Sequence, residues 1–268
     1  IKIQTGFDFT HIVTKNINNI GYFNDHNFIN THKNNSIVVI GDSYVEAAQV
    51  SNKNSISGIL DSSNLINNKV FGIGVSGSSL SQYLAFVEYA KKYLNPKKYI
   101  IVIISNDFDE SLILYKSSPG YYYFDKDFDL MRIDYQPSLI TKIIRKSAFF
   151  RYLFLDLKIN SQIINLIKKE RTKPSKDGQV RDFDNKKIDL SERAITVFLK
   201  KLEILIPNHD VLFVLDGDRG KIYGNRGFNE YTKHMYSHFK DEVSKYNNFN
   251  FLDLNINFEK HYEKNKRK

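Results

Sequence analysis

Five short apolar runs recur along the chain, separated by segments of mixed polarity. They cover residues 37–40, 69–73, 99–104, 210–215 and 250–254. The first three runs are apolar almost throughout, which predicts strands covered on both faces, and the first is rich in β-branched residues. Between them, apolar residues at helical spacing predict helices at about 55–60, 79–94, 190–205 and 227–246. This alternation predicts an α/β fold, a three-layer α/β/α sandwich with about five parallel strands in flavodoxin-like order.

The remaining segments interrupt this pattern. Residues 1–35 are polar and Asn-rich, and we expect an irregular lead-in that packs across the edge of the sheet. Residues 108–136 contain a Pro-Gly turn and the aromatic run Tyr121 to Phe124. They predict an excursion or small hairpin over the edge of the sheet at which the parallel strands end. The aromatic rings suit stacking on sugars, or packing on one another as a lid.

The second half of the chain carries two further irregular stretches. Residues 138–169 predict a long helical stretch, and residues 171–187, with Pro174 and Gly178, predict a charged loop. We expect one domain over residues 1–268, ending in a frayed basic tail.

The composition excludes some classes of function but does not identify one. The formal charge of +9 favours anionic partners such as acidic glycans, phospholipid head groups or nucleic acid. A solvated basic surface explains the charge more simply than a specific nucleic-acid site does. The absence of cysteine excludes disulfides, thiolate nucleophiles and Cys-ligated zinc. No apolar run approaches the ~18 residues of a membrane span.

Three predicted strands end in residues that suit acyl transfer. Ser43 follows the first run, Gly77 lies in the loop after the second, and Asn106 follows the third. The carboxyl ends of parallel strands share one edge, where ligands bind. There Ser43 is a nucleophile if a base removes its proton, or simply a helix cap. A glycine N–H and an asparagine amide are suitable donors for the oxyanion that develops on an acyl carbonyl.

With these blocks the chain resembles the SGNH, or GDSL, hydrolase superfamily. Gly41-Asp42-Ser43 matches the first block, Val75-Ser76-Gly77 the second and Ser105-Asn106-Asp107 the third, although Ser105 replaces the usual glycine. The resemblance implies a nucleophilic serine in the first block and oxyanion donors from the glycine N–H of the second and the asparagine of the third. It implies no metal and no organic cofactor.

The resemblance also implies a function. The context of the first block is similar to that of bacterial members associated with surface polysaccharides. We therefore expect a serine esterase that removes or transfers O-acetyl groups of a bacterial glycan through an acyl-serine intermediate. Its partners would be the glycan or a small acyl ester and membrane-associated biosynthetic proteins, outside the cytoplasm, with no nucleic acid.

The base of this mechanism is not assigned. The superfamily places an aspartate and a histidine close together after the last strand, where this chain offers only His261, with Glu259 two residues before it. That pair fits a surface helix end better than a catalytic pair. Since the sequence begins at Ile1 and stops abruptly at Lys268, we expect the real block to lie beyond it. The alternative is an inactive member that binds a glycan without cleaving it.

Two glycine patterns offer rival interpretations. Gly72-x-Gly74-x-x-Gly77 fits the dinucleotide fingerprint, which calls for an acidic residue ~20 residues further on. Here that residue would be Asp107, 30 residues after Gly77 (107 − 77). Residues 74–78 nearly match a G-x-S-x-G elbow, but Ser78 replaces the last glycine, so Ser76 is a poor second nucleophile.

Three polar clusters complete the candidates. Asp216 and Asp218 suit a cation, with Arg219 for a carboxylate or phosphate, or they form an Asp-Gly turn. His234 and His238 have a metal-ligand spacing, but a structural role is the better interpretation. The Asp8-x-x-His11 motif suits orientation of an imidazole, but it lies in a terminus expected to be mobile.

Overall fold

A five-stranded parallel sheet forms the centre of the fold in the computed structural model, which describes residues 2–5, 11–63, 67–137, 142, 146–147, 185–224 and 227–265. The sheet order is β4-β3-β5-β8-β9, the flavodoxin-like order that the sequence predicts. Its strands are β3 (Ser36–Gly41), β4 (Lys69–Gly74), β5 (Lys98–Ile103), β8 (Asp210–Leu215) and β9 (Phe249–Asp253). Each predicted strand is confirmed to within one residue at either end.

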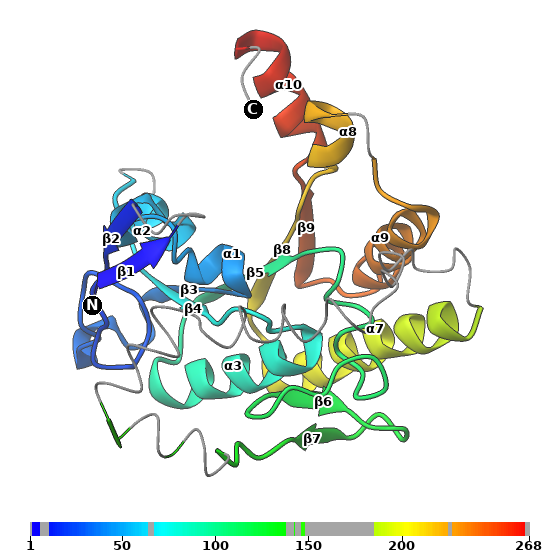
Figure 1. Ribbon diagram of the computed structural model, residues 1–268, viewed down its shortest axis with the longest axis horizontal. Helices are drawn as coiled ribbons and strands as arrows, with labels where there is room; N and C mark the ends of the chain where they lie inside the picture. Colours follow the sequence, from blue (N-terminus) through cyan, green and yellow to red (C-terminus); the bar gives the residue numbers. More distant parts are fainter. Residues whose placement is uncertain are drawn as a thin grey trace, which may run out of the picture.

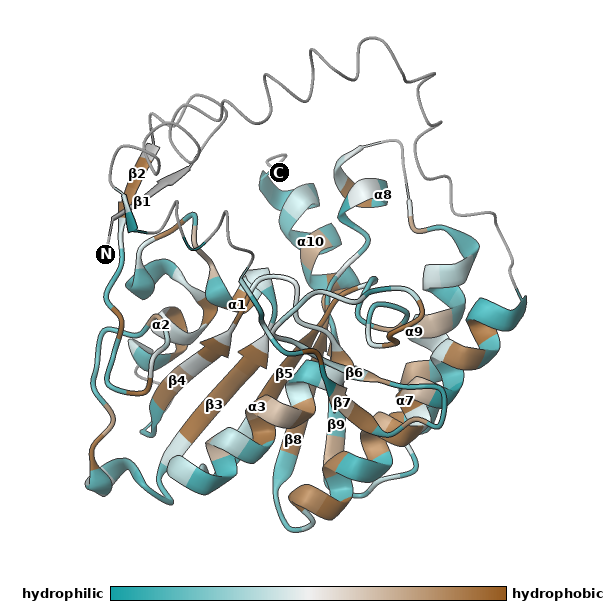
Figure 2. Cartoon of the chain, turned by 60° about the horizontal axis from the view of Figure 1, so that its bottom comes forward, coloured by the Kyte–Doolittle hydropathy of each residue, from teal (hydrophilic) through white to brown (hydrophobic). Residues whose placement is uncertain are grey.

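Helices cover both faces of this sheet (Figure 1). On one face lie α3 (Leu80–Tyr93), α7 (Asn185–Leu205) and α9 (Glu230–Val243), which share the main hydrophobic core with alternate strand residues. On the other face, α1 (Ser43–Glu46) and α2 (Ile56–Asp61) pack their Val45 and Leu60 against β3, β4 and β5. Figure 2 shows β3 and β5 as hydrophobic along most of their length. Burial on both faces therefore explains the unbroken apolar runs.

Several predicted boundaries were wrong or lie outside the described residues. The loop expected up to residue 187 ends earlier, because α7 already begins at Asn185; residues 171–184 are not described. The helix expected over residues 138–169 also falls almost entirely outside the described part. The basic tail is not frayed over residues 255–265, since these form α10 (Asn255–Asn265), which packs on α8 (Arg219–Tyr223).

The lead-in contains regular structure that the sequence did not predict. Strands β1 (Lys2–Thr5) and β2 (His11–Thr14) pair antiparallel, and a short 3-10 helix, η1 (Asn30–His32), follows. A second 3-10 helix, η2 (Asn52–Asn54), lies beyond the lead-in, between α1 and α2. Packing across the sheet edge is confirmed. Asn24 exchanges two hydrogen bonds with the main chain of Gly72 on edge strand β4, at 2.7 and 3.0 Å.

The predicted excursion after β5 is a hairpin. Its strands β6 (Tyr122–Phe124) and β7 (Leu130–Arg132) pair antiparallel, and the Ser81 hydroxyl of α3 donates to the Tyr122 carbonyl at 2.8 Å. Tyr123 and Phe124 are buried, so half of the aromatic run packs into the protein instead of facing a ligand. Within the described ranges, no helix is long and apolar enough to cross a membrane.

Candidate active site

Ser43 opens α1 directly after strand β3. Asp42 is the N-cap of this helix, and its carboxylate accepts from the Tyr44 N–H at 2.9 Å and from the Ser43 hydroxyl at 3.2 Å. Asp42 is buried, which raises the pKa of its carboxyl. The serine is only half-buried. The turn thus holds the serine rigidly while leaving part of it accessible.

Two glycines allow α1 to lie directly on the strand ends. Gly41 and Gly74 are partners across β3 and β4. A Cβ on Gly41 would lie 2.5 Å from Val45 Cγ2, and a Cβ on Gly74 would lie 2.4 Å from the Glu46 nitrogen. Any side chain at either position would push α1, and Ser43 with it, away from the sheet.

A buried lysine of the lead-in holds the other end of α1. The Lys15 ammonium donates to the carbonyls of Glu46 at 2.9 Å and Ala47 at 2.7 Å. The Lys15 residue is 1% exposed, and burial lowers its pKa. A cation at a helix C-terminus satisfies carbonyls that have no partner within the helix. Both ends of the serine-bearing helix are therefore fixed by side chains.

The second block forms a loop after β4 with an unusual backbone. Gly77 has φ +82°, a conformation that side chains disfavour. Glu46 accepts from the Ser76 N–H at 2.8 Å and from the Ser76 hydroxyl. Lys116 donates to the Gly77 carbonyl at 3.0 Å, and Tyr121 donates to the Ser76 carbonyl at 2.7 Å. Among the described residues, the Gly77 N–H has no acceptor, so it remains available to a ligand.

The third block is held by a buried carboxylate. Asp107 is fully buried and accepts from the Ile104 N–H at 2.9 Å and from the Tyr83 hydroxyl at 3.0 and 3.1 Å. Burial raises the pKa of Asp107 well above its usual value. Asn106 beside it is half-buried, and its side-chain amide makes no hydrogen bond to another described residue. Asp107 fixes the turn, and the Asn106 amide stays free to donate.

The same geometry excludes a dinucleotide at the glycine pattern. Asp107 would have to reach a ribose, but it is sealed in the core. Gly72 lies within β4, where a Cβ would be 2.7 Å from the Ser57 hydroxyl. Its lack of a side chain serves the packing of α2 and not the approach of a pyrophosphate. Ser76 is held by Glu46, which accepts from both its N–H and its hydroxyl.

Strand register places the three blocks at one edge of the sheet. β3 lies between β4 and β5, with Ile40 opposite Ile73 on one side and Ile101 on the other. Glu46 joins the first block to the second. Lys116 bridges the Gly77 carbonyl to Glu110, in the turn that follows the third block. The predicted nucleophile and donor residues thus follow three neighbouring strands at their carboxyl ends.

A hollow of about 520 Å³ opens beside Ser43. It is lined by Ser43, Tyr44, Ala47, Gln49, Val50, Asn54, Ser55 and Ile56. None of these side chains carries a formal charge, and the apolar ones among them are partly exposed, Tyr44 by 41%. Such a lining suits an uncharged ligand with both apolar and hydrogen-bonding surfaces.

The two aspartates of the acidic turn after β8 have separate partners and do not form a shared cation site. Asp216 binds Arg219, with Nη2 and Oδ2 2.6 Å apart, and the Arg219 guanidinium lies 4.6 Å over the Tyr44 ring. Asp218 instead caps α8 and accepts from the Phe228 N–H at 2.6 Å. The turn interpretation is therefore the correct one, and Arg219 supports Tyr44 at the rim of the hollow.

None of the described histidine side chains is hydrogen-bonded to Ser43, whose hydroxyl donates to Asp42. His261 is exposed on α10, and Glu259, two positions before it, is exposed as well. Side chains two apart on a helix do not face each other, so Glu259 cannot orient His261. His234 and His238 both approach Glu192, at 2.8 and 3.6 Å, on the outer helices α9 and α7.

The described part of the chain contains no group of three or more metal-ligating side chains. Of the Asp8-x-x-His11 motif, Asp8 and the His11 side chain lie outside the described residues. The other described histidine side chains are His26, His32 and His209, which contact Asp61, Phe28 and Tyr99 respectively.

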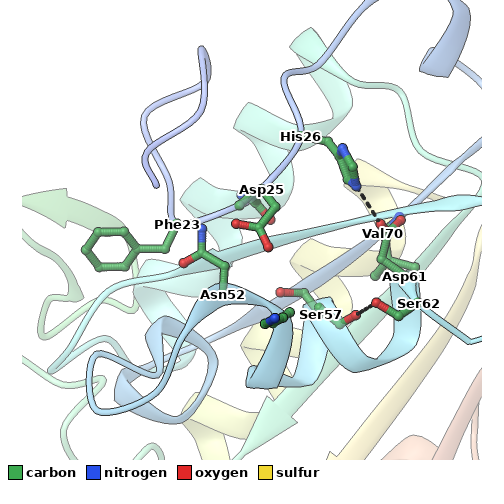
Figure 3. A pocket seen from close by; sticks show the side chains of 11 residues that line it. Phe23, Asp25, His26, Asn52, Ser57, Asp61, Ser62 and Val70 are labelled. Carbon is green, nitrogen blue, oxygen red and sulfur yellow. Dashed lines mark hydrogen bonds and ion pairs between the residues drawn. The ribbon is translucent and has the colours of Figure 1, made fainter. Parts of the chain in front are cut away.

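A separate small hollow gathers serine, histidine and aspartate between the lead-in and α2 (Figure 3). His26 points to Asp61, with Nε2 and Oδ2 3.3 Å apart. However, the Ser62 hydroxyl donates to the Gly58 carbonyl, and the Ser57 hydroxyl lies 3.2 Å from that of Ser55. Neither serine is aimed at the imidazole. At about 40 Å³ the hollow has room for water only.

The sheet order, with three blocks at one edge, resembles the SGNH, or GDSL, hydrolases. Comparison with protein-family profiles and with curated proteins gave no match. Among solved structures, the chain is similar to one described as a GDSL-like lipase from Bacteroides ovatus ATCC 8483, with 11% identity and a TM-score of 0.41 over 82% of this chain and 43% of that one.

Two further solved structures are similar at the same level. TesA shares 12% identity, with a TM-score of 0.38 over 78% of this chain and 73% of TesA. EstA, an esterase from Pseudoalteromonas sp., shares 11% identity, with a TM-score of 0.38 over 82% of this chain and 76% of EstA. The chain spans less than half the length of the Bacteroides ovatus protein.

Sequence reasoning missed the side chains that support the blocks. Glu46 and Ser76, which share a hydrogen bond, are 30 residues apart in the sequence, and Tyr121 and Ser76 are 45 apart. Lys15 is 31 and 32 residues from the two carbonyls that it binds at the end of α1. Each is an ordinary polar residue in its local context. Only Glu46 offered a local signal, because it lies three residues after the predicted nucleophile Ser43 on the same short helix.

Proposed function

We propose that the protein is a serine esterase of the SGNH type. Ser43 attacks the ester carbonyl and gives up its hydroxyl proton, and the bond from the acyl carbon to the ester oxygen breaks, so that the alcohol leaves with that proton. The acyl group then passes from Ser43 to water or to another hydroxyl, whose proton returns to Ser43. The Gly77 N–H and the Asn106 amide hold the oxyanion in both tetrahedral intermediates. One observation carries the proposal. The other three main-chain polar groups of Ser76 and Gly77 are bound by side chains, and the Gly77 N–H is left open.

We further propose that the substrate is an O-acetyl ester of a bacterial glycan. The uncharged hollow beside Ser43, with Tyr44 at its rim, suits a sugar ring, which offers apolar faces and hydroxyl groups. The sequence context of the first block supports the same class. Hydrolysis and acetyl transfer share the acyl-serine, so both belong to the proposal. Work on a surface glycan would place the protein outside the cytoplasm.

A second candidate is a domain that binds the glycan without cleaving it. The observation that favours it is that no described histidine side chain is hydrogen-bonded to Ser43, whose hydroxyl donates to the neighbouring Asp42, whereas the proposed mechanism needs a base for the serine proton. Turnover separates the two candidates, since a binding domain shows none.

The direct test is p-nitrophenyl acetate turnover by the protein and by two serine variants. Ser43→Ala should abolish turnover. Ser62→Ala is the matched control, because it removes a hydroxyl that donates only to the Gly58 carbonyl on α2, and it should leave the rate unchanged. Turnover that survives Ser43→Ala would rule out the proposed nucleophile. Binding of acetylated glycan without any turnover would favour the second candidate.

A further inference from the structure

The peptide bond between Ser76 and Gly77 carries both the open donor and a carbonyl bound by a tyrosine. Its N–H belongs to Gly77, and its C=O belongs to Ser76. The Tyr121 hydroxyl donates to that carbonyl at 2.7 Å. A trans peptide unit is planar, so its N–H and C=O point in opposite directions. A side chain that fixes the direction of the Ser76 carbonyl therefore also fixes the direction of the Gly77 N–H.

A hydrogen bond to the carbonyl also strengthens the donor at the other end. Hydrogen bonds in a chain polarise one another, so a peptide whose oxygen accepts a bond has a more positive N–H. Burial raises the pKa of the Tyr121 phenol, which keeps the hydroxyl protonated and able to donate at neutral pH. Tyr121 thus acts on both the orientation and the donor strength of the Gly77 N–H.

The neighbouring groups hold the two ends of this peptide unit. Glu46 accepts from the Ser76 N–H and hydroxyl, and Lys116 donates to the Gly77 carbonyl. Both contacts involve a charged group, the stronger kind of hydrogen bond. With the peptide units on either side held, rotation of the central one depends mainly on the bond to Tyr121.

We propose that Tyr121 is a positioning residue of the esterase, acting through the Ser76 carbonyl to aim and polarise the Gly77 N–H at the oxyanion. This assignment rests on the proposed function. It gives the excursion after β5 a task in the reaction: the segment that leads into β6 sets the oxyanion donor. The competing explanation is that Tyr121 only docks the hairpin onto the second-block loop.

Tyr123 provides the matched control for that explanation. It lies two residues further along the same hairpin, and its hydroxyl accepts from the Ser118 N–H at 3.0 Å. Tyr121→Phe and Tyr123→Phe each remove one hydroxyl with one hydrogen bond from the same segment. Only Tyr121→Phe changes a bond to the second-block loop. Urea unfolding of both variants measures any general loss of stability.

The experiment compares kcat and KM for p-nitrophenyl acetate in the protein, both tyrosine variants and Ser43→Ala. Tyr121→Phe should lower kcat about 3–10-fold, the rate equivalent of one net hydrogen bond. KM should change less than about twofold, because a donor aimed at the oxyanion acts in the transition state. Inhibition by a boronic acid, which forms a tetrahedral adduct on serine, should weaken in parallel. Tyr123→Phe should leave all of these values within about twofold.

Each result has one meaning. Ser43-dependent turnover with equal effects of the two tyrosine variants would overturn the role of Tyr121 while leaving the esterase in place. A Tyr121→Phe effect confined to KM would do the same. Absence of Ser43-dependent turnover would overturn the proposed function and this inference together. A selective loss of kcat in Tyr121→Phe supports both.

Discussion

Replacing Gly41 with alanine tests how closely α1, the helix that begins at Ser43, packs on the sheet. A Cβ there would lie 2.5 Å from Val45 Cγ2 and 3.3 Å from Val102 Cβ, whereas carbon atoms make favourable contact at about 3.5–4.0 Å. Overpacking of a core typically costs about 1–3 kcal/mol. We expect Gly41→Ala to lower the free energy of unfolding by that amount and to displace Ser43 from its position.

The overlap involves mainly one methyl group, so a second substitution should relieve it. Val45 is 4% exposed. Val45→Ala alone removes two methyl groups from the core, at about 0.8 kcal/mol each, or about 1.6 kcal/mol in all. Because it also removes Cγ2, the variant Gly41→Ala/Val45→Ala should be about 1–2 kcal/mol more stable than the sum of the single effects.

Gly74 is the matched control for this cycle. A Cβ on Gly74 would meet the Glu46 nitrogen at 2.4 Å and the Val45 carbonyl carbon at 2.8 Å, and Val45→Ala leaves both atoms in place. The Gly74→Ala/Val45→Ala pair should therefore couple by less than about 0.5 kcal/mol. Urea unfolding followed by circular dichroism measures all of these free energies. Equal coupling in the two pairs would refute the packing that we describe for α1.

Two further substitutions test the groups that support the site. Asp107→Asn keeps an acceptor for the Ile104 N–H and the Tyr83 hydroxyl but removes an ionisable group. Burial raises the folded-state pKa of Asp107 above 3.8, so the native state binds more protons than the unfolded state at pH values just above 3.8. The contribution of Asp107 to the free energy of unfolding therefore falls as the pH rises through that range. Urea unfolding at stepped pH should show that the free energy of the parent protein, measured relative to Asp107→Asn, falls as the pH rises, and a constant difference would contradict the burial of a titrating group. Lys15→Met removes the donor from two carbonyls at the end of α1 and should lower the free energy of unfolding by about 1–3 kcal/mol in thermal or urea denaturation. An unchanged midpoint would show that the ammonium does not hold α1.

The central sheet could be predicted because strands that are buried on both faces appear in the sequence as short apolar runs. Strands β3, β4, β5 and β8 are mostly apolar runs, whereas edge strand β9 contains Asn250 and Asp253 and is largely exposed. Each of the five lies within one residue of its predicted place. The three blocks were recognisable for a related reason. Each follows a strand directly, so local order along the chain already places Ser43, Gly77 and Asn106 at one edge.

The supporting contacts could not be predicted, because tertiary packing decides them. Nothing near Tyr121 distinguishes the phenol that binds the Ser76 carbonyl from that of Tyr123, which binds Ser118. The prediction of a frayed C-terminal tail was wrong for a similar reason. Its charged residues indicated fraying, but the Tyr262 ring packs 5.4 Å from that of Tyr223 on α8, which supplies an apolar contact for α10.

The assignment of the base stays a prediction. The structure shows why His261 and Glu259 do not form a catalytic pair, since they are exposed on one helix at positions that do not face each other. The Asp/His block expected from the resemblance has no counterpart among the described residues that contact Ser43.

The measurement that tests the central claim most directly is the location of the acyl group during turnover. The protein is mixed with an acetyl ester, quenched in acid within the first turnover, digested and mapped by mass spectrometry. We predict an acetyl group on Ser43, and none in Ser43→Ala treated in the same way. Turnover without acetyl-Ser43, or an acetyl group on another serine such as Ser76, would contradict the proposal that Ser43 is the nucleophile.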